Sequence, residues 1–172
     1  METNCRLIQD IALPAAGRKM MGVDNGIGLA GSQEPINDVI WQLKVHEGFK
    51  AKPYRDSIGI WTIGYGINLE QGMTEREAAM ILEERVRKLR HRLSMVIRPW
   101  KQLSPARQDV LVNMAYNLGI SGLLRFKKML KALTAEAYSH AADEMMNSIW
   151  AGQVGSAPGQ RAHVIAEQMR KG

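Results

Sequence analysis

Two acidic residues and one hydroxyl residue stand close together in the chain, at spacings that could serve hydrolysis. Glu47 is followed nine residues later by Asp56, and Thr62 follows six residues after that. Two carboxyl groups held apart on rigid elements can break a glycosidic bond, because one protonates the leaving oxygen while the other handles water or the sugar. The segment from Glu47 to Thr62 is therefore the first candidate for an active site.

A short amphipathic helix is predicted just before this segment, over residues 37–47, with Gly48 able to end it. Ile40 and Leu43 lie on one face, and Glu47 continues the same stripe four residues further on. A carboxylate is costly on an apolar face, and at a helix C-terminus the dipole disfavours its charge. These costs favour a functional role for Glu47 over its alternative, a buried acid in an ion pair.

Residues 54–66 alternate strand-forming and turn-forming residues, which predicts a small hairpin sheet. Asp56 lies where the chain turns, and taken alone it would be an ordinary turn residue that bonds its own backbone. Thr62 taken alone is a residue that suits a strand. The order of the acids and the hydroxyl, rather than any one of them, therefore indicates a site.

The stretch resembles the active-site segment of phage lysozymes of the T-even type, glycoside hydrolase family 24. That family has Glu, then Asp, then a Thr that precedes Gly-x-Gly, and the matching residues here are Glu47, Asp56 and Thr62-Ile63-Gly64-Tyr65-Gly66. The resemblance continues through Asn113–Gly119, Ser148–Trp150 and Arg161-Ala162, and covers roughly residues 36–172. It departs at Ile67, where the T-even type has a histidine.

The resemblance implies a role for each matching residue. Glu47 would be the general acid, while Asp56 and Thr62 would hold the attacking water on the other face of the sugar. That geometry corresponds to inversion, with carboxyl groups roughly 6.5–9.5 Å apart. Arg161 would pair with the catalytic glutamate. Asn117 and Trp150 would line the substrate cleft; a helix-end polar group and a core tryptophan are the alternatives left open. No metal or organic cofactor is implied, and the four histidines have no metal-ligand spacing.

The same resemblance implies an α+β, mainly helical, lysozyme-like fold. Its catalytic domain would span residues 36–172, with a small lobe over 36–71 that holds the β-hairpin and a helical lobe over 72–172. A long helix at 74–98 would join the lobes, and Thr74-Glu75-Arg76-Glu77 has the pattern of a capping box at its start. Further helices are predicted from Ser104-Pro105, where Gly119 closes the helix, and over 123–133, 137–147 and 161–170.

Composition and charge narrow the function further. The single cysteine, Cys5, cannot form an internal disulfide, so the fold cannot rely on oxidation. The formal charge of +6 favours anionic polymers such as cell wall, lipopolysaccharide or nucleic acid, and a mildly basic solvated surface is equally open. The basic cluster at 85–92 lacks interleaved aromatics, so we expect no nucleic acid to bind it. No segment has the length expected of a signal peptide core or a membrane span.

The function that the resemblance implies is a lysozyme, an N-acetylmuramidase that cleaves the β-1,4 bond between N-acetylmuramic acid and N-acetylglucosamine in peptidoglycan. This glycosidase would lyse bacterial walls. It would be made in a host cytoplasm and act in the periplasm, either as an endolysin released by a holin or carried by the virion. Two other classes stay open: a non-catalytic wall-binding or virion structural module that keeps the fold, and a basic DNA-associated protein.

Residues 1–35 have no counterpart in the resemblance and are predicted to form an arm or leader. Several glycines and Pro35 interrupt any helical or strand periodicity of apolar residues there. Our hypothesis is that the arm docks on another protein, for instance within a virion. Deleting residues 1–34 should then leave hydrolysis intact and abolish that association, as measured by wall clearing and by co-purification with particles. Lost catalysis in the truncated protein would contradict the hypothesis.

Overall fold

The computed structural model describes residues 34–172, so most of the predicted arm lies outside the described residues. Chain contacts divide the molecule into two units. Among the described residues, one unit comprises 34–54 with 63–67, and the other comprises 55–62 with 68–172. The predicted lobe limits at 36–71 and 72–172 stay a prediction.

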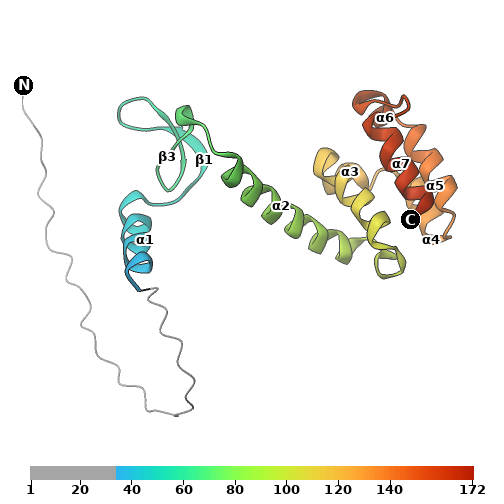
Figure 1. The fold of residues 1–172 in the computed structure, drawn as a ribbon, viewed down its shortest axis with the longest axis horizontal. Helices are drawn as coiled ribbons and strands as arrows, with labels where there is room; N and C mark the ends of the chain where they lie inside the picture. The colour runs from blue at the N-terminus through green and yellow to red at the C-terminus, as the bar shows by residue number, and fades with distance from the viewer. Residues whose placement is uncertain (1–33) are drawn as a thin grey trace, which may run out of the picture. The chain divides into compact units, whose positions relative to one another are not determined.

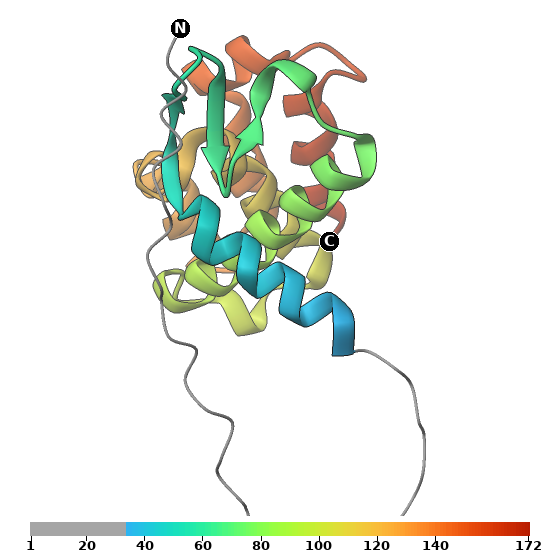
Figure 2. The same ribbon diagram turned by 90° about the vertical axis from the view of Figure 1, so that its left-hand side faces the viewer.

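The described chain begins with a helix and a small sheet and continues as a run of helices. The first elements are α1 (Glu34–Glu47), β1 (Lys50–Arg55), β2 (Trp61–Gly64), β3 (Ile67–Asn68) and the 3-10 helix η1 (Leu69–Gln71) (Figure 2). The others are α2 (Glu75–Val96), the 3-10 helix η2 (Trp100–Gln102), α3 (Pro105–Leu123), α4 (Lys127–Thr134), α5 (Tyr138–Met146), α6 (Ile149–Val154) and α7 (Arg161–Lys171) (Figure 1). The predicted fold class, α+β and mainly helical, is confirmed.

Helix α1 begins at Glu34, three residues before the predicted start, and ends at Glu47 as predicted. Gly48 follows it with a φ of 64°, and its N–H group donates to the carbonyl of Lys44 at 3.2 Å. This left-handed residue is a common way for a helix to end, and glycine adopts it without the penalty of a Cβ atom. Glu47 is thereby fixed as the last helical residue.

The strands form one sheet in the order β1-β2-β3. The connections between them are five and two residues long, and because parallel strands need a crossover of a dozen or more residues, the sheet is antiparallel. This confirms the predicted hairpin. The longer connection, residues 56–60, holds Asp56, and β2 holds Thr62.

Helix α2 has the capping box that its sequence predicts. The hydroxyl of Thr74 accepts from the N–H group of Glu77 at 3.3 Å, and the Glu77 carboxylate accepts from the Thr74 N–H group at 2.7 Å. The helix ends at Val96, two residues before the predicted end, and Ile97 is extended. Pro99 explains this end, because proline disfavours helical geometry in the residue before it.

The core of the second unit lies among its helices. Helix α7 packs against α3, α5 and α6, and α5 also packs against α4. The fully buried side chains include Leu93, Leu111, Met114, Leu123, Met129, Leu133, Met145 and Met169. Arg107 anchors the end of α7, because its guanidinium donates to the carbonyls of Met169 at 2.9 Å and Arg170 at 3.2 Å. This packing holds α7, the helix that begins with Arg161.

Two features of the helical unit differ from the prediction. Gly119 leaves helical geometry with φ 71° and ψ 163°, but the chain resumes a helical turn and α3 reaches Leu123. Helix α6 has no counterpart among the predicted helices. Ser148 caps it, since its hydroxyl accepts from the N–H group of Ala151 at 3.1 Å.

Thr74→Ala should lower the free energy of unfolding by about 1 kcal/mol, because it removes the N-cap of α2. The backbone hydrogen bond from Thr74, followed by that from its hydroxyl, lowers the pKa of Glu77 below its ordinary value of 4.5. A lowered folded-state pKa stabilises the fold above the unfolded value, and this stabilisation is lost as pH falls through the folded value. Urea unfolding of both proteins at pH 7 and pH 3 should therefore show the larger difference at pH 7. An unchanged midpoint at pH 7 would contradict this role for the cap.

Candidate active site

Glu47 lies with its carboxylate against the backbone of Gly66, within one unit. A Cβ atom built on Gly66 would lie 2.7 Å from Oε2 and 3.1 Å from Cδ of Glu47. Gly66 also has a φ of 72°, which L side chains rarely adopt. The second glycine of the Gly-x-Gly segment thus leaves the space that the acid occupies.

An aromatic pair joins the same two segments. Phe49 follows α1 and Tyr65 precedes Gly66, and their ring centroids are 5.3 Å apart with the planes tilted by 48°. Lys44 of α1 lies 5.9 Å from the centre of the Tyr65 ring. Aromatic pairs in this range of separations attract one another beyond the area they bury. The pair therefore helps to hold the turn at Gly66 beside the end of α1.

Asp56 forms the local turn that its residue type predicts. Its Oδ1 accepts from the N–H groups of Ile58 at 3.0 Å and Ile60 at 2.8 Å. The Asp56 N–H group donates to the carbonyl of Ile60 at 3.0 Å, and Arg55 donates to the carbonyl of Gly59 at 2.6 Å. The ordinary turn-forming role is therefore present. The turn also fixes the orientation of the Asp56 carboxylate, which is half-buried. Among residues 34–172, every hydrogen bond to this carboxylate involves Oδ1.

Thr62 is buried, with 4% of its surface exposed, and its hydroxyl donates to the carbonyl of Ile60 at 3.2 Å. Asp56 bonds the N–H group of the same residue. The backbone of Ile60 therefore ties Asp56 and Thr62 together. Sequence reasoning missed this bridge, because Ile60 contributes its peptide groups and any side chain could stand there.

Arg161 starts α7 and binds Asn113 of α3. Its Nε and Nη2 donate to the side-chain oxygen of Asn113 at 3.0 and 2.7 Å, and Nη2 also donates to the Asn113 carbonyl at 3.2 Å. Asn113 was not among the predicted site residues. The available signal was its spacing of four from Asn117, which puts both amides on one helix face. The ion pair of Arg161 with Glu47 stays a prediction.

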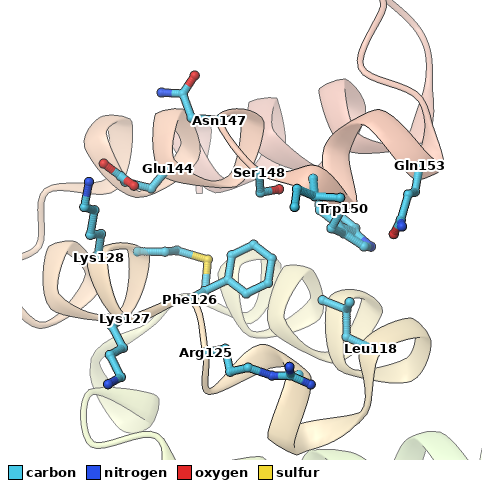
Figure 3. Close-up of a pocket in the computed structure, with 13 residues that line it drawn as sticks. Leu118, Arg125, Phe126, Lys127, Lys128, Glu144, Asn147, Ser148, Trp150 and Gln153 are labelled. Atoms are coloured by element: carbon cyan, nitrogen blue, oxygen red, sulfur yellow. The ribbon is translucent and has the colours of Figure 1, made fainter.

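Asn117 and Trp150 are brought together, since the indole N–H group of Trp150 donates to Oδ1 of Asn117 at 3.0 Å. Trp150 is 3% exposed and belongs to the core, where its ring meets Phe126 edge-on with centroids 6.3 Å apart. It also lines a cavity of about 720 Å³ between the end of α3 and the α5–α6 segment. Figure 3 shows Ser148, Trp150 and Gln153 on one side of this cavity, Leu118 and Arg125 on the other, and Phe126 between them. Substrate contact by Asn117 and Trp150 stays a prediction.

Residues 44–164 match the family model for phage lysozyme, which is more than half of the chain. The chain belongs to the phage lysozyme family. The matched segment contains Glu47, Asp56, Thr62 and Arg161, so the predicted resemblance is confirmed.

Two relatives show how far this similarity extends. The chain is 28% identical over 149 residues to the "Probable T4-type lysozyme 1" of Dictyostelium discoideum, which covers 67% of this chain and 85% of that protein. It is also 28% identical over 108 residues to the "Endolysin" of Acyrthosiphon pisum secondary endosymbiont phage 1, covering 60% and 72% of the two chains. Family and relatives together support hydrolysis of peptidoglycan as the class of reaction. In the described part of the chain, no helix has the length and apolar character to cross a membrane.

Gly66→Ala should reduce lytic activity sharply, because the new Cβ atom would meet the Glu47 carboxylate at 2.7 Å and displace it. Gly72→Ala is the matched control: Gly72 has the same φ of 72°, and a Cβ atom there meets nothing within 4 Å. Both variants should lose roughly 1 kcal/mol of stability from the left-handed backbone, as measured by thermal unfolding. Equal activities of the two variants would show that the approach of Gly66 to Glu47 has no bearing on function.

Proposed function

We propose that this protein is an N-acetylmuramidase that hydrolyses the β-1,4 bond between N-acetylmuramic acid and N-acetylglucosamine in peptidoglycan. The main support is the segment that matches the family model. In it the Glu47 carboxylate lies against Gly66, and the backbone of Ile60 hydrogen-bonds both Asp56 and Thr62. The substrate would be the bacterial wall.

Glu47 would donate the proton to the leaving glycosidic oxygen. A general acid must be held in one place relative to the bond it protonates, and such a group contributes about 10²–10⁴ in rate. The positive φ of Gly48 ends α1 directly after Glu47, and the space left by Gly66 accommodates its carboxylate. Both features support Glu47 as the fixed acid.

Asp56 and Thr62 would hold and polarise the attacking water. The turn amides of Ile58 and Ile60 fix Oδ1 of Asp56, so its Oδ2 is available as the acceptor for a water molecule. The Thr62 hydroxyl lies on the next strand and retains an oxygen lone pair for the same water. In an inverting hydrolase the water occupies the space between two carboxyl groups roughly 6.5–9.5 Å apart, and we expect that separation for Glu47 and Asp56.

Arg161 would pair with the carboxylate of Glu47 once the acid has donated its proton. Its planar guanidinium has five N–H donors, and those that bind Asn113 use Nε and Nη2. Nη1 is left for a carboxylate partner. The cavity beside Trp150 would receive part of the wall polymer, with Asn117 orienting the indole.

The route to the wall is part of the proposal. The protein would act on the periplasmic wall either as an endolysin released by a holin or as a component of the virion. Its presence in purified phage particles would distinguish the second route from the first.

Glu47→Gln should abolish clearing of permeabilised Gram-negative cells while the fold is retained, because an amide cannot donate the catalytic proton. Asp56→Asn should be strongly impaired, although an amide can still orient water to some degree. Glu83→Gln, an exposed acid on α2, is the matched control and should clear normally. Turbidity measures the rate, and circular dichroism checks the fold.

Mass spectrometry of the released fragments tests the bond. A muramidase leaves N-acetylmuramic acid at the new reducing end. Reducing N-acetylglucosamine would contradict the proposed bond while leaving a glycosidase in place. Normal clearing by Glu47→Gln would contradict the role of Glu47, and inactivity of the unaltered protein would favour a non-catalytic wall-binding module.

A further inference from the structure

The excess of basic over acidic residues in this protein comes from one stretch of the chain. Residues 85–131 contain twelve basic residues and one acidic residue, Asp109. The basic residues are Arg85, Arg87, Lys88, Arg90, Arg92, Arg98, Lys101, Arg107, Arg125, Lys127, Lys128 and Lys131. The remaining sequence contains eleven basic and sixteen acidic residues. The net charge of +6 is thus an average over a strongly basic segment and an acidic remainder.

Few carboxylates neutralise this segment. Arg90 binds Asp109, the only acid within it. Glu84 forms salt bridges with Arg87 at 2.7 Å and with Lys88 at 3.0 Å. Within the part of the chain that the structure describes, no carboxylate lies within 4.0 Å of Arg85, Arg92, Arg98, Lys128 or Lys131. Unneutralised like charges on neighbouring elements repel one another, and an anionic partner would relieve that repulsion.

These basic residues follow a continuous track over the helical unit. Arg85, Lys88 and Arg92 are three and four residues apart, so they form one stripe along α2. They line a groove of about 400 Å³ together with Leu89 and Tyr116. Tyr116 is 47% exposed, whereas Leu89 is half-buried.

The stripe leads to the far end of α2. Met95 and Val96 continue it, and Val96 lines a second groove of about 280 Å³ with Arg98, Leu124 and Lys131. Lys131 also lines a third groove, of about 310 Å³, with Lys128 and His140. Shared residues therefore link the α2 stripe to α4.

Apolar side chains lie between the basic ones. Met95 is 74% exposed, Val96 47% and Leu124 38%. Binding to duplex DNA is dominated by contacts with phosphates, and exposed aliphatic side chains at the centre of the surface would not contribute to such contacts. The boundary of a phospholipid bilayer offers anionic headgroups beside acyl chains, and basic residues flanking apolar ones match both.

We propose that this basic surface, defined as Arg85, Lys88, Arg92, Arg98, Lys128 and Lys131 with Met95, Val96 and Leu124, binds the face of an anionic phospholipid bilayer. The basic groups contact headgroup phosphates, and the three apolar side chains enter the headgroup region. Binding is peripheral and does not depend on the hydrolytic site. It would keep the protein at the surface of a bacterial membrane, next to the wall.

The test is co-sedimentation of the full-length protein with vesicles of phosphatidylcholine alone or with 30% phosphatidylglycerol. We expect binding only to the anionic vesicles, weakened by added salt. Arg92→Ser/Arg98→Ser/Lys131→Ser should reduce the partition coefficient roughly a hundredfold, since each basic residue near an anionic surface contributes about fivefold. Lys52→Ser/Arg76→Ser/Lys171→Ser removes the same charge from positions outside the basic surface and should bind nearly as well as the unaltered protein.

Met95→Ser/Val96→Ser tests the apolar contribution at unchanged charge, and it should lower binding most at high salt, where the charges are screened. Thermal unfolding checks that each variant folds. Equal losses in the two charge triplets would overturn the proposal, because net charge alone would then explain binding. Binding to a 20-base-pair DNA duplex without binding to anionic vesicles would overturn it in favour of nucleic acid.

Discussion

The approach of the Gly66 backbone to the Glu47 carboxylate is the constraint on which the candidate site depends. Glycine alone combines the positive φ with the missing Cβ atom that this approach requires. Gly48 imposes a similar condition one residue after Glu47, because its left-handed conformation ends α1 there. The acid is thus placed by two backbone conformations, and the Phe49–Tyr65 pair helps to hold the two segments together.

The second acid is positioned by the same means. Peptide groups of Ile58 and Ile60 hold Asp56, and the Ile60 carbonyl holds the Thr62 hydroxyl. Backbone donors are present whatever the side chain, so a site built on them can persist while the sequence diverges. The chain is 28% identical to two of its relatives, so most of its side chains differ from theirs. In this chain the positive φ of Gly48 and Gly66 favours glycine at those two positions.

Features with a local cause were the ones that the sequence predicted well. The capping box at Thr74, the helix start at Ser104-Pro105 and the helix end at Gly48 each depend on a few neighbouring residues. The start of α1 was misplaced because Pro35 was interpreted as a breaker, whereas proline is well tolerated in the first turn of a helix.

Features that depend on short elements or distant partners could not be predicted in this way. Helix α6 has six residues, too few for a periodicity to be visible, and it contains Gly152. The hydrogen bonds from Arg161 to Asn113 join residues 48 positions apart, and neither local sequence predicts them. The family resemblance supplied Arg161 as a site residue, but only the packing of α7 on α3 identifies its partner.

The distribution of charge adds a property that composition alone conceals. A protein whose +6 is spread evenly would be attracted to an anionic surface without a preferred orientation. Here residues 85–131 carry a formal +11 and the rest of the chain carries −5, so attraction and repulsion act on different parts of the molecule. Such an asymmetry favours orientations in which the α2 and α4 residues face the anionic surface. Orientation, rather than affinity alone, is therefore what this arrangement of basic residues provides.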